Sequence, residues 1–153
     1  MVLRNASVED APTLLRLMHA AFEEYRGMLA PPTGAHDETI DSVRRRLAEG
    51  SAVLALVARE AAGCAFYQRV KDFVYFSRLS VVPAYRNRGI GTALLEYVEQ
   101  RAREQGVGSV RLGVRLQLPH LVRRYEKLGY RVIEQVTHEG FDKPTYVMME
   151  KHV

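Results

Sequence analysis

The residues best suited to chemistry in this chain lie in one short loop, Arg86-Asn87-Arg88-Gly89-Ile90-Gly91. An apolar run closed by Pro83 precedes the loop and predicts a strand, and a helical pattern follows it directly. The first N–H groups of a helix have no partner within the helix, and the helix dipole adds partial positive charge there. Glycine lets a phosphate approach the backbone, and arginines add further positive charge. We therefore predict a phosphate or pyrophosphate site in this loop.

Two common phosphate-binding motifs do not fit the loop. A dinucleotide fingerprint requires a third glycine where Leu94 stands, and an acidic residue about twenty positions further on. The sequence has no Asp or Glu between Glu104 and Glu126. A P-loop requires Gly-Lys-Ser/Thr, whereas this chain reads Gly91-Thr92-Ala93. The remaining pattern is a strand followed by Arg-x-x-Gly-x-Gly.

Length and composition set broad limits on the protein. The chain has 153 residues, 47% of them hydrophobic, which predicts one domain over residues 1–153 with a sizeable core. We attribute the net charge of +4 to an arginine-rich surface and an anion site, because the arginines form no basic tract. The single cysteine, Cys64, excludes an internal disulfide, and no apolar run is long enough to cross a bilayer. We therefore expect a cytoplasmic protein with neither a membrane nor a nucleic acid as partner.

Other catalytic chemistry has little support in the sequence. The five histidines show no metal-ligand spacing, so we predict no metal site. No Gly-x-Ser-x-Gly elbow for a serine nucleophile is present. Cys64 lies within a predicted strand, and we interpret it as a small buried hydrophobic residue.

The elements that position the loop follow from hydrophobic periodicity and from turn residues. Strands are predicted over 2–5, 52–58, 63–70, 73–82, 109–114, 130–137 and 145–151. Helices are predicted from about Asp10 to Gly27, from a cap at Asp37 to Gly50, from the loop to Gly106, and over 119–128. The strand–helix–strand passage through the loop requires its two strands to be parallel. The sequence therefore predicts an α/β fold with a mixed, mostly antiparallel sheet of about seven strands and helices on both faces.

A second motif lies downstream, Tyr125-Glu-Lys-Leu-Gly-Tyr130. Together with Arg-x-x-Gly-x-Gly and the order of the predicted elements, it resembles the GNAT superfamily of N-acetyltransferases over nearly the whole chain. The resemblance implies the GNAT fold, acetyl-CoA as acyl donor, and direct attack by a primary amine in a ternary complex. The acceptor amine would belong to a small molecule or a peptide, and homodimers are common in the family. Arg123 and Arg124 would either meet the CoA 3′-phosphate or lie in solvent, the commoner place for such residues.

The resemblance also implies roles for individual residues. Main-chain groups of Leu79, Ser80 and Val81 would pair with the pantetheine arm, and an amide near Val81 would polarise the thioester carbonyl. Tyr125 matches the family's frequent general acid, which protonates the CoA thiolate, although its spacing alone favours a packed aromatic residue. The loop and first helical turn would hold the pyrophosphate through Arg86, Asn87, Arg88, Gly89, Ile90, Gly91 and Thr92.

Two positions depart from the family pattern. Leu118 stands where many members carry an asparagine, and Gly113 stands where some carry a glutamate base. The departures leave a second function class open, a GNAT-fold module that binds acyl-CoA as a sensor without turnover. They also leave the general base open between a water chain and a residue elsewhere, such as Glu23, Glu24, His138 or Glu139.

The acceptor is expected between the connection of the first two helices, Tyr25 to His36, and the last hairpin, His138 to Asp142. Acidic residues near these segments would attract a cationic amine. They are Glu23, Glu24, Asp37, Glu139 and Asp142.

Overall fold

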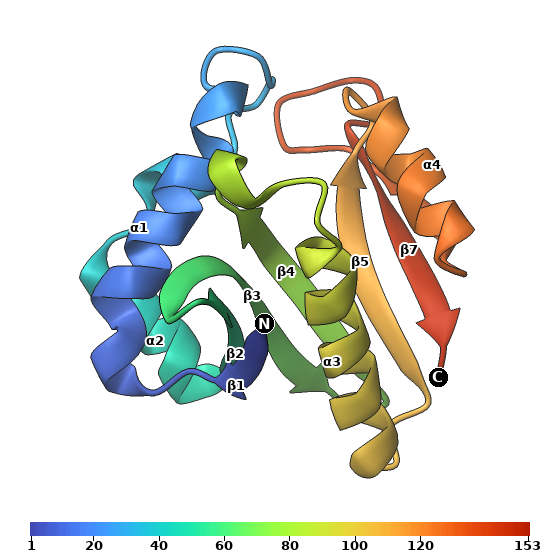
Figure 1. Cartoon of the computed structure of the whole chain (residues 1–153). Coiled ribbons are helices and arrows are strands. Elements are labelled where there is room, and N and C mark those ends of the chain that lie inside the picture. The colour runs from blue at the N-terminus through green and yellow to red at the C-terminus, as the bar shows by residue number, and fades with distance from the viewer.

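The computed structural model describes residues 1–153, and its centre is a seven-stranded sheet in the order β1-β2-β3-β4-β5-β7-β6 (Figure 1). Every neighbouring pair is antiparallel except β4 and β5, which are parallel. This arrangement confirms the predicted mixed sheet. The strands are β1 Val2–Asn5, β2 Ser51–Val57, β3 Glu60–Val70, β4 Phe73–Val81, β5 Ser109–Arg115, β6 Arg131–Val136 and β7 Tyr146–His152.

Helices cover both faces of the sheet, as predicted. The α-helices are α1 Ala11–Phe22, α2 Ile40–Glu49, α3 Ile90–Glu104 and α4 Pro119–Lys127. On one face, apolar residues of α1 and α2 form a buried cluster with alternate residues of β2 and β3. On the other face, apolar residues of α3 form a second cluster with the intervening residues of these strands, and α4 packs against this second cluster. No helix has the length and apolar character needed to span a membrane.

Two predicted helix boundaries are wrong. The second helix begins at Ile40 and is capped by Thr39, whose Oγ1 accepts a hydrogen bond from the Ser42 amide at 3.1 Å. Asp37 instead ends a separate 3-10 turn. Threonine can serve as the N-cap in place of Asp37, because the extended backbone at Thr39 lets its hydroxyl reach an amide of the first helical turn. The first helix ends at Phe22 and continues only as a 3-10 turn to Tyr25.

The two parallel strands separate soon after they meet. Hydrogen-bonded pairing joins Phe73–Tyr75 of β4 to Ser109–Arg111 of β5 and goes no further. On its other side, β4 carries an extra residue, because Cys64 of β3 lies opposite Ser80 and Phe66 lies opposite Ser77. Arg78, within this bulge, has a left-handed φ of 54°. Because a bulge bends its strand, β4 turns away where its pairing with β5 ends.

A buried carboxylate ties the bulge to the neighbouring helix. Glu38 accepts hydrogen bonds from Ser42 Oγ at 2.6 Å and from Arg78 Nε at 3.1 Å, and Arg46 Nη2 lies 2.7 Å away. Burial alone would raise the pKa of Glu38, but the hydrogen bonds from Arg46, Ser42 and Arg78 and the charge of Arg46 lower it to about 2. The ionised side chain therefore stabilises the bulge and the start of α2 together.

We expect Glu38→Gln to lower the free energy of unfolding at pH 7 by about 3 kcal/mol, because it leaves two guanidinium groups without their carboxylate. The pKa of Glu38 is depressed in the folded state, so its contribution is complete above the ordinary pKa of 4.5 and is lost as pH falls towards 2. Urea unfolding at pH 7 and pH 3 should show the two proteins converging. Glu104→Gln, which breaks an exposed pair with Arg101, is the control and should change stability little.

Candidate active site

A cavity of ≈ 530 Å³ lies where β4 and β5 separate, and both faces of the sheet contribute to its wall. The end of α1 and the chain after it line one part through Glu24, Tyr25 and Leu29. The start of α3 and one side of α4 line the other part. The gap between the strands therefore joins two compartments on opposite sides of the sheet.

The glycine loop forms the wall at the start of α3. Asn87 and Gly89 both have left-handed φ angles, 63° and 79°, so the loop turns tightly into the helix. The first intrahelical bond runs from the Ala93 amide to the Gly89 carbonyl at 3.0 Å. The N–H groups of the residues between them therefore precede the hydrogen-bonded ladder and are free to bind an anion.

Gly91 keeps this wall open, and Arg124 of α4 lies beside it. A Cβ at position 91 would lie 3.3 Å from Arg124 Nη2 and 3.6 Å from the Leu79 side chain. Arg124 lines the cavity and has no carboxylate within ion-pair distance. Its charge adds to the positive end of α3. The neighbouring Arg123 is exposed like Arg124 but does not line the cavity.

The two loop arginines have other contacts. Arg86 donates from Nε to the Val81 carbonyl at 3.2 Å and from Nη2 to the Ala21 carbonyl at 3.0 Å, and its Nη1 lies 2.7 Å from Glu24. Arg88 lies over the Tyr85 ring at 5.2 Å and does not line the cavity. Arg86 thus braces the end of β4 against the end of α1.

Most residues predicted for the site lie together. Ser80, Arg88 and Thr92 are not among the lining residues; Ser80 is fully buried and its hydroxyl donates to the Arg78 carbonyl at 3.0 Å. The predicted residues that line the cavity are Leu79, Val81, Arg86, Asn87, Gly89, Ile90, Gly91 and Tyr125.

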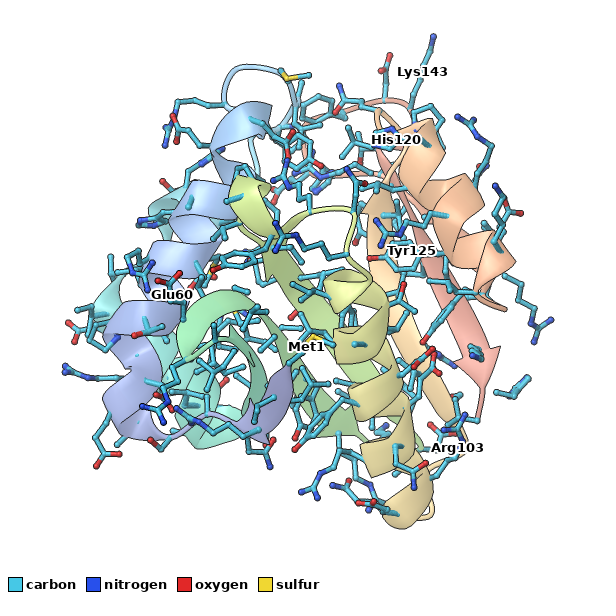
Figure 2. The ribbon with its side chains drawn as sticks, viewed as in Figure 1. Met1, Glu60, Arg103, His120, Tyr125 and Lys143 are labelled. Atoms are coloured by element: carbon cyan, nitrogen blue, oxygen red, sulfur yellow. The ribbon has the colours of Figure 1, made fainter.

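Tyr125 projects from α4 towards β5 (Figure 2). Its ring packs edge-on against Tyr130, with centroids 6.0 Å apart. Burial raises the pKa of Tyr125 to about 12. The hydroxyl of Tyr130 donates to Glu99 at 2.8 Å, whereas that of Tyr125 makes no hydrogen bond within the protein. Tyr125 is therefore a protonated phenol in the cavity wall with its hydroxyl free for a ligand.

The other compartment lies on the α1–α2 side of the sheet. Alternate residues of β5, from Val110 to Val114, belong to the core under α3, so Gly113 and Arg115 face the opposite way. A Cβ at Gly113 would lie 3.6 Å from the Tyr75 hydroxyl of β4. Tyr75, Gly113 and Arg115 all line the cavity, and none of them was predicted for the cofactor site.

A segment between α1 and α2, Leu29–Thr33, borders this compartment. Arg115 donates from Nη1 to the Pro31 carbonyl at 2.6 Å and from Nη2 to the Pro32 carbonyl at 3.3 Å. The Ala30 amide donates to Gln117 Oε1 at 3.1 Å. Leu29 and Thr33 are buried and line the cavity. We call this segment the strap.

The carboxylates expected to attract a cationic acceptor lie mostly outside the cavity. Of the five carboxylates proposed, only Glu24 lines the cavity, and it pairs with Arg86. Glu23 pairs instead with Arg26 at 2.9 Å. Nothing from His138 to Asp142 lines the cavity, so the last hairpin does not form its wall. The charged residues that do line it are mostly cationic: Arg78, Arg86, Arg115 and Arg124.

Sequence reasoning missed Arg78, Arg115 and His120 as cavity residues. The alternation of β5 carried a signal for Arg115, because an arginine two residues after Gly113 must share its face. Arg78 left no such signal, since the extra residue in β4 changes which face it occupies. His120 lies near the start of α4 (Figure 2), where the predicted helix gave no reason to prefer it over its neighbours.

The fold has many solved counterparts. A PaiA N-acetyltransferase from Thermoplasma acidophilum, crystallised in complex with coenzyme A, matches with a TM-score of 0.83 at 19% identity, over 100% of both chains. Ard1 from Thermoplasma volcanium matches with a TM-score of 0.81 at 22% identity, over 99% of this chain and 97% of that one. The ribosomal-protein-S18-alanine N-acetyltransferase from Escherichia coli matches with a TM-score of 0.78 at 18% identity, over 99% of this chain and 92% of that one.

Sequence comparison agrees with the fold. No curated protein matches the chain. The sequence model of the Acetyltransferase (GNAT) family matches residues 14–130, which include the loop, the helix α3 and the Tyr125 motif. The chain therefore belongs to the GNAT family and is an acetyl-CoA-dependent acyltransferase.

Proposed function

We propose that the protein, acting as one domain, transfers the acetyl group of acetyl-CoA to a primary amine by direct attack in a ternary complex. The observation that carries this proposal is the cavity between β4 and β5. It joins an anion-binding loop on the α3 face to a separate compartment on the α1–α2 face. Two substrates can therefore meet within the sheet without sharing a binding surface.

The donor would lie along the α3 face. Amides from Asn87 to Thr92 would bind the pyrophosphate, with Arg124 alongside, while Arg88 and Thr92 would contribute backbone alone. The separated edge of β4 would pair with the pantetheine arm through main-chain groups of Leu79, Ser80 and Val81. Because the Val81 carbonyl already accepts from Arg86, we assign Val81 the thioester contact through its amide.

The neutral amine nitrogen attacks the thioester carbonyl carbon, the C–S bond breaks, and the sulfur leaves as a thiolate that takes the proton of Tyr125. The nitrogen loses one proton as the amide forms, and this proton passes through water to the Tyr125 phenolate, which restores the phenol. Burial raises the pKa of Tyr125 to about 12, so the phenol stays protonated at neutral pH. Burial raises the pKa of a thiol as well, so partial desolvation of the CoA sulfur in the cavity would favour transfer of the Tyr125 proton to it.

The base for the amine need not be a side chain. Glu24 is the only carboxylate that lines the cavity, and it is held 2.7 Å from Arg86. We propose that water accepts the proton of the acceptor ammonium. The acceptor would lie in the compartment on the α1–α2 face, which we call the acceptor compartment. Arg78 and Arg115 on that face favour the loss of the proton, because nearby positive charge disfavours the ammonium form.

Gly91→Glu should abolish acetyl-CoA binding, since it places a carboxylate beside Arg124 where we assign the pyrophosphate. Acetyl-CoA should raise the melting temperature of the wild type and not that of the variant. Gly108→Glu is the control, because a side chain there meets nothing within 4 Å and it adds the same charge. Binding that persists in Gly91→Glu would refute this location for the donor.

Arg124→Gln should raise the Kd of CoA about tenfold and weaken its dependence on salt, because one charge beside the pyrophosphate is lost. Calorimetric titration at two salt concentrations measures both effects. Arg123→Gln, one residue away on the same helix, removes an equal charge from outside the cavity. Equal losses in the two variants would mean that only net charge matters.

Tyr125→Phe should lower kcat about a hundredfold and leave the Kd of acetyl-CoA and the melting temperature nearly unchanged. The hydroxyl makes no hydrogen bond within the protein, so its removal costs no packing. Tyr130→Phe is the contrasting variant: it should lower stability, because Glu99 loses a buried donor, while the chemical step persists. Release of free thiol with an acetylated amine gives the rate, and an unchanged kcat in Tyr125→Phe would refute the acid role.

A further inference from the structure

Arg115 carries a charge that the protein does not neutralise. Its guanidinium is half-buried, and its two hydrogen-bond acceptors, the carbonyls of Pro31 and Pro32, are uncharged. No carboxylate lies within ion-pair distance of it. Burial, and then the charge of Arg78, lowers the pKa of Arg115. A half-buried cation without a counter-ion is only partly solvated, so an anion beside it would be favoured.

The surroundings of Arg115 add to this uncompensated positive charge. Arg78 on the same face shares the single carboxylate of Glu38 with Arg46, so that group of charges is also positive overall. Glu24, the one carboxylate of the cavity, is occupied by Arg86. The acceptor compartment therefore has an excess of positive charge that no residue of the chain offsets.

The donor does not explain this charge. Arg115 points to the α1–α2 face, whereas the loop and Arg124 that we assign to the pyrophosphate line the α3–α4 face. Alternation along β5 separates the two sites by the thickness of the sheet. The anion that Arg115 suits must then belong to the second substrate.

We propose that the acceptor amine also carries a carboxylate, and that Arg115 binds this carboxylate in the acceptor compartment. The planar fork of arginine matches a carboxylate, and the strap over the compartment suits a small molecule such as an amino acid. Polycationic acceptors would meet like charge and are disfavoured. The inference rests on the proposed N-acetyl transfer and names the class of its substrate.

The first test compares amines that differ only in the carboxylate. Amino acids and their carboxamides would be assayed for thiol release, with kcat/KM expressed per neutral amine so that the different amine pKa values do not interfere. We expect the acids to be preferred about 10- to 100-fold, the range of a charge-assisted hydrogen-bonded contact. Equal or better turnover of the amides, or acetylation of neither series while other amines react, would overturn the inference.

The second test asks whether Arg115 makes the difference. Arg115→Gln should raise KM for the acids about 10- to 100-fold and leave that for the amides nearly unchanged, and Arg115→Lys should restore part of the loss. Arg123→Gln is the matched control. Because Arg115 also holds the strap, a merely structural role would impair acids and amides equally, and that result would overturn the assignment.

A binding measurement separates failure of this inference from failure of the proposed function. Calorimetry with N-acetyl amino acids in the presence of CoA needs no turnover, and their affinity should fall in Arg115→Gln. If acetyl-CoA binds and amines are acetylated without regard to the carboxylate, the inference alone fails. If acetyl-CoA does not bind or no amine reacts, the proposed function fails, and Arg115-dependent binding of the N-acetyl amino acid still decides the assignment.

Discussion

The separation of β4 from β5 is the constraint on which the site depends. Two parallel strands that stayed paired would form a continuous wall, and the faces of the sheet would not communicate. Pairing ends after Tyr75 and Arg111, and the bulge at Arg78 bends β4 away. Glu38 holds the bulged arginine to α2, so the opening is part of the folded core and does not wait for a ligand to form it. The cavity, the exposed strand edge and the loop beyond it all follow from this separation.

Positive charge is distributed differently in the two compartments. On the α3 face, much of it comes from backbone amides at a helix start, which suit a phosphate because they need no particular side chain. On the opposite face it comes from Arg78 and Arg115, whose guanidinium groups are held by Glu38 and by the strap carbonyls. The first arrangement is common to anion sites at helix ends. The second depends on two side chains, those of Arg78 and Arg115.

Much of the fold was predictable because its signals are local. The apolar alternation of the strands, the glycine loop before Ile90 and the turn at Gly106 each act within a few residues. The sheet and the loop to which we assign the pyrophosphate followed from them. The acceptor side was not predictable in the same way. The acidic residues near it in sequence are engaged elsewhere, as Glu23 is by Arg26, and the arginines that line it come from separate strands. Which charges meet in a compartment is decided by long-range packing and by one extra residue in β4, and neither leaves a local pattern.

Gly113 gives the acceptor compartment a property beyond its charge. A Cβ placed there would meet Met148, Tyr146 and Tyr75 at 3.6 Å, ordinary contact distances, so a side chain would fit by filling the compartment. A glutamate at this position would bring a base and, with it, a negative charge and a smaller volume. Glycine leaves this space available to the acceptor and adds no negative charge that would offset Arg78 and Arg115. Any side chain at this position of β5 would therefore take up volume on the α1–α2 face of the sheet, the face opposite the glycine loop.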